Sequence, residues 1–444
     1  MSGWSARRLH VVGIAGAGMS AYAIVCRALG AAVTGSDRVE SPYLARVREA
    51  GIEPAIGHDA ANLPRGDDVE VVASTAIPAD NPELAAARER GLRVLSRAEL
   101  LAELTREKRT IAVAGAHGKT TTASMLAHAL LGCGMDPSYV IGGTLSTTGT
   151  NAAWGSGEWL VVEADESDRS FLALDVEIAV VTNIELDHHT EYASRLELEA
   201  AFREFLAGAP VAVLPAGLLA LRDDAAPPAP PAPPAPPAAA TALRTEVAGA
   251  WAGPPLAVPG EHNRLNAAAA LEAAVLAGAP RERAAAELAA FRGAGRRFEE
   301  LGRTASGAVV VDDYAHHPTE VAATIAAARE RGFARVVAVF QPHLYSRTEH
   351  LAREFGAALA RADVVGVLEV YPARERAEDF PGVTGRLVAE AAADAGGGRR
   401  VLWLPGFAAA ERALREELRE GDLLLVLGAG DVDALGRRLV SGQS

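Results

Sequence analysis

The stretch VAGAHGKTTTASM, residues 113–125, decides how this sequence is interpreted. An apolar, strand-like run leads into it and a helix-favouring run follows, which is the setting of a phosphate loop. The usual pattern, G-x-x-x-x-G-K-[ST], has a glycine five residues before the G-K pair. Here Val113 takes that place, and the nearest upstream glycine is Gly115. A lysine in the first turn of a helix is unfavourable unless an anion lies beside it. We therefore interpret the stretch as a shortened phosphate loop, in which Lys119 reaches the β/γ-phosphates and Thr120 can bind Mg²⁺.

Length and composition limit the possible classes of protein. A chain of 444 residues is too long for one ordinary core, so we expect two or three domains. The formal net charge of −14 argues against broad binding of nucleic acid. Two cysteines, Cys26 and Cys133, make no disulfide framework and fit a cytoplasmic location. No apolar run is long enough to span a bilayer, so we expect no membrane partner.

Strand-like and helical runs alternate along three segments, which predicts an α/β fold with parallel sheets. We place the predicted domains at residues 1–108, 109–295 and 296–444. The middle segment is interrupted by PPAPPAPPAPP, residues 227–237, which can form neither a helix nor a paired strand. It predicts polyproline II structure or disorder.

A second glycine turn, GIAGAG at residues 13–18, follows the first predicted strand and opens a helix. Asp37 ends the next strand, where a dinucleotide fold has its ribose-binding acid. The order G-x-x-G-x-G differs from the dinucleotide fingerprint, so a bound nucleotide or diphosphate and plain tight-turn packing are equally good interpretations.

Acidic and histidine residues follow two further strands, in VVEADESD (161–168) and NIELDHHTEY (183–192). The carboxyl ends of neighbouring parallel strands meet at one edge of a sheet, which favours Glu163 and His188 as metal ligands near the lysine loop. We interpret Glu166, Asp168 and Glu191 as solvated loop residues.

Polar residues also gather in the last part of the chain. In GEHNRLNAA (260–268), Asn263 and Asn266 are spaced to share a helix face, where they could bind an adenine edge or simply cap and cover the helix. DDYAHHPTE (312–320) and FQPHLYSRTEH (340–350) each end a predicted strand just before a helix, which is the usual position of a ligand crevice in an open sheet.

Taken in order along the chain, these motifs resemble those of the Mur ligases of bacterial cell-wall synthesis. The resemblance covers nearly the whole chain and rests on GIAGAGMSA, GAHGKTTT, EADESD, TNIELDH, PGEHNRLNAAAA, GRRFE, DDYAHHPTE and FQPHLYSRT. The last two are most similar to the alanine-adding member. The resemblance implies three domains: a Rossmann-like domain for the UDP part of the substrate, a central P-loop ATPase domain, and a Rossmann-like domain for the amino acid.

The resemblance also implies an activity. ATP would phosphorylate the lactyl carboxylate of UDP-N-acetylmuramate, and the amine of L-alanine would attack the acyl phosphate, in peptidoglycan precursor synthesis. Mg²⁺ would be required, with Mn²⁺ as a substitute, and the protein would be a monomer or a homodimer. The near alternative is a recycling ligase that joins a tripeptide to the same sugar nucleotide. An NAD-dependent oxidoreductase and a catalytically silent binding protein are rivals from other classes.

The motif match further implies roles for single residues. The residues implied to bind ATP are Gly115, Ala116, His117, Gly118, Lys119, Thr120, Thr121, His262, Asn263 and Arg297. Those implied to bind the UDP substrate are Gly16, Ala17, Gly18, Met19, Ser20 and Asp37. The implied metal ligands are Thr120, Glu163 and His188, and the implied amino-acid pocket comprises Tyr314, His316, His343 and Arg347. Lys119, Glu163, His188, His343 and Arg347 would be the catalytic residues.

The chain departs from the family pattern at three places. Leu344 follows the histidine of FQPH where an arginine is frequent, and this leaves more of the carboxylate recognition to Arg347. Gly295 stands where a lysine or arginine is common. Residues 209–259 are short and rich in proline, which predicts a reduced central lobe.

Overall fold

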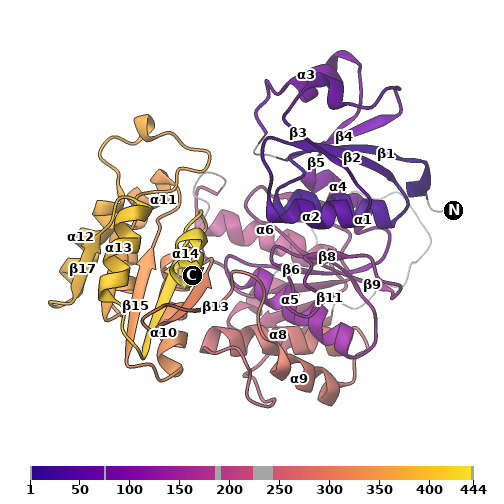
Figure 1. Ribbon diagram of the computed structural model, residues 1–444. Coiled ribbons are helices and arrows are strands. Elements are labelled where there is room, and N and C mark those ends of the chain that lie inside the picture. The colour runs from indigo at the N-terminus through magenta and orange to yellow at the C-terminus, as the bar shows by residue number, and fades with distance from the viewer. Residues whose placement is uncertain (1–2, 75–76, 186–191, 224–243, 442–444) are drawn as a thin grey trace. The chain divides into compact units, whose positions relative to one another are not determined.

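The structure is a computed structural model that describes residues 3–74, 77–185, 192–223 and 244–441 (Figure 1). Its chain forms two compact units, the first made of residues 1–255 and 265–291, and the second of residues 256–264 and 292–444. The first unit contains two sheets and the second contains one, which confirms the predicted three-part α/β fold. The predicted domain boundaries themselves stay a prediction.

The N-terminal sheet is parallel and doubly wound, with strand order β3-β2-β1-β4-β5. Its strands are β1 (Arg8–Val12), β2 (Ala32–Asp37), β3 (Pro54–Ile56), β4 (Val69–Ala73) and β5 (Val94–Ser96). Its helices are α1 (Ala17–Ala28), α2 (Pro42–Glu49), α3 (Pro82–Glu89) and α4 (Arg97–Leu104), with short 3₁₀ turns η1 (Gly3–Ala6) and η2 (Ala60–Asn62). The glycine turn lies between β1 and α1, at the point where the strand order reverses and ligands of open sheets bind.

The central sheet has the order β12-β11-β10-β6-β9-β7-β8 and is parallel except where β8 pairs with β7. Its strands are β6 (Arg109–Ala114), β7 (Ser138–Val140), β8 (Ala152–Ala153), β9 (Trp159–Glu163), β10 (Ile178–Val181), β11 (Val211–Pro215) and β12 (Arg244–Ala248). Its helices are α5 (Lys119–Gly132), α6 (Arg195–Gly208), α7 (Ala220–Asp223), α8 (Glu261–Leu276) and α9 (Arg281–Ala290), with 3₁₀ turns η3 (Ser170–Ala173) and η4 (Ala216–Leu218).

Residues 209–259, which were predicted to form a reduced lobe, contribute β11 and β12, and these strands extend the central sheet at one edge. The proline tract at 227–237 lies outside the described residues.

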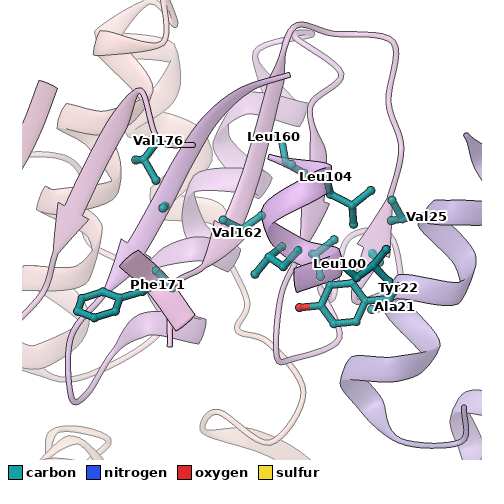
Figure 2. Packing of buried hydrophobic residues seen from close by; sticks show 14 of the residues in the cluster. Ala21, Tyr22, Val25, Leu100, Leu104, Leu160, Val162, Phe171 and Val176 are labelled. Atoms are coloured by element: carbon teal, nitrogen blue, oxygen red, sulfur yellow. The ribbon is translucent and has the colours of Figure 1, made fainter. Parts of the chain in front are cut away.

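One hydrophobic cluster joins the two sheets of the first unit. Figure 2 shows Tyr22 and Val25 from α1 beside Leu100 of α4, near Leu160 and Val162 of β9. All five side chains are at most 5% exposed, and burying side chains of this size stabilises a fold by roughly 1.5–3 kcal/mol each. The glycine turn and the lysine loop are therefore held within one packed body.

The C-terminal sheet has the order β13-β14-β18-β15-β16-β17, with β13 antiparallel to β14 and the rest parallel. Its strands are β13 (Glu299–Arg303), β14 (Val309–Asp313), β15 (Arg335–Phe340), β16 (Val364–Val367), β17 (Arg400–Trp403) and β18 (Asp422–Leu427). Its helices are α10 (Pro318–Glu330), α11 (Tyr345–Leu359), α12 (Gly385–Ala395), α13 (Phe407–Glu417) and α14 (Asp433–Ser441), with the 3₁₀ turn η5 (Ala377–Asp379).

Two separate hydrophobic clusters cover this sheet, one with α10, α11 and α12 and the other with α13 and α14. Helices on both faces leave the carboxyl ends of the strands as the open edge for ligands. Among the described residues, every helix is too short or too polar to cross a membrane.

Candidate active site

The lysine loop occupies residues 115–118, between β6 and α5. Val113 is fully buried inside β6, so the missing glycine falls on the strand and not on the loop. Gly118 has φ +81°, and a Cβ there would lie 2.6 Å from Oδ1 of Asn266 on α8. Gly115 has φ +133°, and a Cβ there would lie 2.3 Å from Oγ1 of Thr182. The loop thus takes a shape that only glycine allows at both positions.

Thr182 and Asn183, which follow β10, hold this loop in place by hydrogen bonds, and neither had a predicted role. The Asn183 side chain accepts a hydrogen bond from the His117 amide at 3.0 Å and donates one to the His117 carbonyl at 2.8 Å. The Thr182 hydroxyl donates to the same carbonyl at 2.5 Å. The sequence TNIE (182–185) could have indicated this role, because a Thr-Asn pair at the end of a strand can form hydrogen bonds with a neighbouring loop.

Lys119 is paired with a buried carboxylate. Its Nζ lies 2.9 and 3.0 Å from the two Glu166 carboxylate oxygens and donates to the Gly115 carbonyl at 2.6 Å. Burial alone would lower the pKa of Lys119, but the charges of Glu166 and Asp165 outweigh it and raise that pKa. Burial raises the pKa of Glu166 against the opposing charge of Lys119.

The interpretation of Glu166 as a solvated residue is therefore wrong. It is 2% exposed, because the chain after β9 turns back toward the lysine, and the Tyr192 hydroxyl holds the Glu166 carbonyl at 2.7 Å. Asp168 is exposed, as expected. Glu191 lies outside the described residues.

Thr120 and Glu163, two of the three implied metal ligands, lie close together beside the lysine. The Thr120 hydroxyl donates to Glu163 Oε2 at 2.9 Å, and the Gly142 amide donates to Oε1 at 2.5 Å. A Cβ on Gly142 would come within 3.0 Å of Glu163 and 3.2 Å of Thr120, so the glycine leaves the space around this pair open. A hydroxyl and a carboxylate together are oxygen ligands that fit Mg²⁺. The third implied ligand, His188, lies outside the described residues.

The glycine turn of the N-terminal sheet leads into α1, whose N-cap is Gly16. The Asp37 carboxylate accepts a hydrogen bond from the Ala15 amide at 2.9 Å, so in this structure it braces the turn. The Ser20 hydroxyl donates to the Ala17 carbonyl at 3.0 Å. Ala17, Gly18 and Met19 form the first turn of the helix, where the free amides favour a bound anion.

Arg97, at the start of α4, was not singled out from the sequence. Its guanidinium lies 3.9 Å from the place of a Cβ on Gly18, and its Nη2 donates to Asp165 at 3.2 Å. The residue therefore adds positive charge between the glycine turn and the acidic loop after β9.

The second unit brings together the aromatic residues that the sequence analysis assigned to the amino-acid pocket. The rings of Tyr314 and His316 are 5.3 Å apart, and those of His316 and His343 are 6.1 Å apart. The Arg297 guanidinium lies 5.0 Å from the Tyr314 ring. Arg347 lies in the first turn of α11, four residues after His343. These residues stand at the carboxyl ends of β14 and β15, where a ligand crevice was predicted.

Of the two residues on α8 that were implied to bind ATP, Asn263 is buried and His262 is partly exposed. Asn263 is 5% exposed and donates to the Pro259 carbonyl at 2.7 Å, as a residue that stabilises the start of α8 would do. Burial lowers the pKa of His262. Asn266, the other asparagine of the predicted helix face, is the residue that a Cβ on Gly118 would meet.

Models of known protein families match three regions of the chain. The model for the Mur ligase family catalytic domain matches residues 8–109, that for the Mur ligase middle domain matches 113–224, and that for the Mur ligase glutamate ligase domain matches 296–430. The chain belongs to the Mur ligase family. Each matched region of this Mur ligase contains most of one of the three sheets.

Two relatives are named UDP-N-acetylmuramate–L-alanine ligase. One, from Acidithiobacillus ferrooxidans, is 46% identical over 98% of this chain and 97% of its own length. The other, from Kineococcus radiotolerans, is 49% identical over 98% of this chain and 96% of its own. The crystal structure of the UDP-N-acetylmuramate–alanine ligase of Thermotoga maritima is similar to this Mur ligase with a TM-score of 0.78 and 27% identity, over 97% of this chain and 98% of that one.

Proposed function

We propose that this Mur ligase joins L-alanine to the lactyl carboxylate of UDP-N-acetylmuramate at the expense of ATP, in peptidoglycan precursor synthesis. The observation that carries the proposal is the convergence of Lys119, Thr120 and Glu163 at a glycine loop that opens α5. The names of the full-length relatives supply the substrates. The two cysteines are free, which fits the cytoplasm as the location.

The first chemical step activates a carboxylate that would not otherwise react with an amine. A carboxylate oxygen forms a bond to the γ-phosphorus of ATP, the bond from that phosphorus to the β–γ bridging oxygen breaks, and ADP leaves. Lys119 would leave Glu166 and neutralise charge on the transferring group, while the loop amides hold the phosphates. Thr120 and Glu163 would hold Mg²⁺, which when bound supplies further positive charge to the phosphates.

The UDP part of the substrate would bind in the N-terminal domain. The first-turn amides of α1 suit a diphosphate, and the Asp37 brace fixes the turn that presents them. The turn then needs no nicotinamide, and the NAD-dependent alternative has no use for the lysine loop.

The second step forms the amide bond. The alanine amine attacks the acyl carbon, and inorganic phosphate leaves from the tetrahedral intermediate. Arg347 would pair with the alanine carboxylate through a charge-assisted hydrogen bond, and Tyr314, His316 and His343 would line the pocket. Arg297, next to Tyr314, would contribute positive charge for phosphate.

The test is phosphate release from ATP and Mg²⁺ with UDP-N-acetylmuramate, with L-alanine, glycine, L-serine or L-Ala-γ-D-Glu-diaminopimelate added in turn. We expect release that depends on L-alanine and is lost in Lys119→Ala. Release with the tripeptide alone would replace this proposal with the recycling ligase, and no release with any acceptor would support a silent binding protein.

A further inference from the structure

The helix that carries Arg347 begins without a cap of its own. Leu344 is the N-cap residue of α11, and its hydrocarbon side chain cannot accept a hydrogen bond from the amides of the helix. Leu344 also has φ +71°, a conformation that a leucine rarely adopts. The first amides of a helix have no partner within the helix, so another group must satisfy them if the first turn is to stay ordered.

Glu375 supplies that group from a different part of the chain. Its Oε2 accepts a hydrogen bond from the Ser346 amide at 3.0 Å, and its Oε1 accepts one from the Ser346 hydroxyl at 2.5 Å. Ser346 is the second residue of α11 and the direct neighbour of Arg347. A carboxylate at a helix N-terminus is favoured by the helix dipole, and its hydrogen bonds are charge-assisted.

Glu375 belongs to a segment that also contacts other residues near the start of α11. This segment, Tyr371–Phe380, follows β16, and we call it the clamp segment. The Tyr371 amide donates to the Pro342 carbonyl at 2.8 Å, and the Tyr371 carbonyl accepts from the Leu344 amide at 3.0 Å. The Tyr371 ring stacks on His343, with centroids 5.7 Å apart and planes 14° apart.

Further along the clamp segment, Phe380 stacks on Tyr345 with centroids 6.0 Å apart. The segment therefore contacts the chain on both sides of the strained Leu344, and Glu375 is its charged contact with the helix.

We propose that Glu375 is a positioning residue for the acceptor amino acid. It fixes the first turn of α11 and thereby the direction of the Arg347 guanidinium, while Tyr371 fixes His343. The inference rests on the proposed function, because that function gives Arg347 its role.

The test compares Glu375→Ala with Glu375→Gln and with Glu378→Ala as the matched control. Glu378 lies in the same segment, and its interaction among the described residues is an exposed ion pair with Arg376. We measure kcat and the KM values for L-alanine, ATP and UDP-N-acetylmuramate by phosphate release. We expect Glu375→Ala to raise the KM for L-alanine about tenfold, because a displaced Arg347 would lose about one charge-assisted hydrogen bond to the alanine carboxylate, and to leave the KM for ATP unchanged. Glu375→Gln keeps an acceptor for the Ser346 amide, so it should restore part of the affinity, and the control should match the wild type.

Ser346→Ala provides a second route to the same result. It removes one of the two bonds to Glu375, so we expect a smaller rise in the alanine KM and no additive effect in the double variant with Glu375→Ala. An unchanged alanine KM in a folded Glu375→Ala protein would overturn the inference, as would an equal rise in the KM for ATP. If the wild type uses another acceptor, the proposed function is wrong, and the KM for that acceptor decides the role of Glu375.

Discussion

Gly118 is the residue on which the shape of the nucleotide loop depends most directly. It combines a left-handed backbone with an Asn266 oxygen 2.6 Å from the place of a Cβ. We expect Gly118→Ala to weaken ATP binding at least tenfold, because the loop must shift to relieve both strain and clash. Gly134→Ala is the control, since Gly134 has φ +78° and no described atom lies within 4 Å of its Cβ position. Equal ATP affinity of the two variants in equilibrium binding would show that the loop tolerates the shift.

Glu166 gives a second prediction at this scale. The carboxylate holds Lys119 at 2.9 Å, so ATP must displace it before the lysine can reach phosphate. We expect Glu166→Gln to bind ATP about fivefold more tightly, because a neutral amide competes less for the lysine by roughly 1 kcal/mol. Asp168→Asn, in the same loop but exposed, should bind ATP as the wild type does. Weaker binding by Glu166→Gln, measured by calorimetry, would mean that Glu166 orients Lys119 for the nucleotide instead.

Among single residues, those that lie together in one short stretch of sequence could be placed in the candidate site from the sequence. The pair of glycines around His117, and the lysine and threonine after them, could be assigned because one loop contains them all. Glu166 could not, because its burial depends on contacts with Lys119 and Tyr192, which lie 47 residues before it and 26 residues after it. Glu375 was missed for the same reason.

At the scale of the element, α3 is tied to the N-terminal sheet by a buried charge. Glu83 on α3 is fully buried, and its carboxylate accepts from Ser36 of β2 at 2.6 Å and from Asn62 at 2.8 Å. Its Oε2 also lies 3.1 Å from Nε2 of His10 on β1. Burial would raise the pKa of Glu83, but the hydrogen bonds from His10, Ser36 and Asn62 outweigh it and lower that pKa to about 2.

A lowered pKa stabilises the fold at pH values above the unfolded pKa of 4.5, and the effect is lost as the pH falls through about 2. We expect Glu83→Gln to reduce the free energy of unfolding by about 3 kcal/mol at pH 7 and by only about 1 kcal/mol at pH 3. Denaturant unfolding at both pH values measures this, with Glu40→Gln, an exposed partner of Arg48, as the control. An equal loss at pH 7 and pH 3 would assign the effect to packing and not to charge.

The elements themselves were largely predictable. The strands predicted to end at DDYAHHPTE (312–320) and FQPHLYSRTEH (340–350) are β14 and β15, and a helix follows each of them as expected, α10 and α11. The ends of elements were less predictable, because the groups that cap a helix can come from distant parts of the chain. The first turn of α11 is capped by Glu375, which lies after β16 and not in the loop just before the helix. The order of the strands in the C-terminal sheet, where β18 lies between β14 and β15, also could not be read from local periodicity.

In the molecule as a whole, three sheets contribute to one proposed reaction. The N-terminal and central sheets share one hydrophobic cluster, so the turn proposed for UDP and the loop proposed for ATP belong to one packed unit. The residues proposed for the amino acid belong to the second unit. The residues proposed to activate the carboxylate therefore lie in the first unit, and those proposed to bind the attacking amino acid lie in the second.

The central claim, that the lysine loop serves to phosphorylate a carboxylate, is tested most directly by following one oxygen atom. UDP-N-acetylmuramate labelled with ¹⁸O in its lactyl carboxylate is turned over with ATP, Mg²⁺ and L-alanine, and the released phosphate is analysed by mass spectrometry. An acyl phosphate passes one carboxylate oxygen to phosphate, so we expect one ¹⁸O in each phosphate formed from doubly labelled substrate and no product with Lys119→Ala. Release of unlabelled phosphate during alanine-dependent turnover would contradict it.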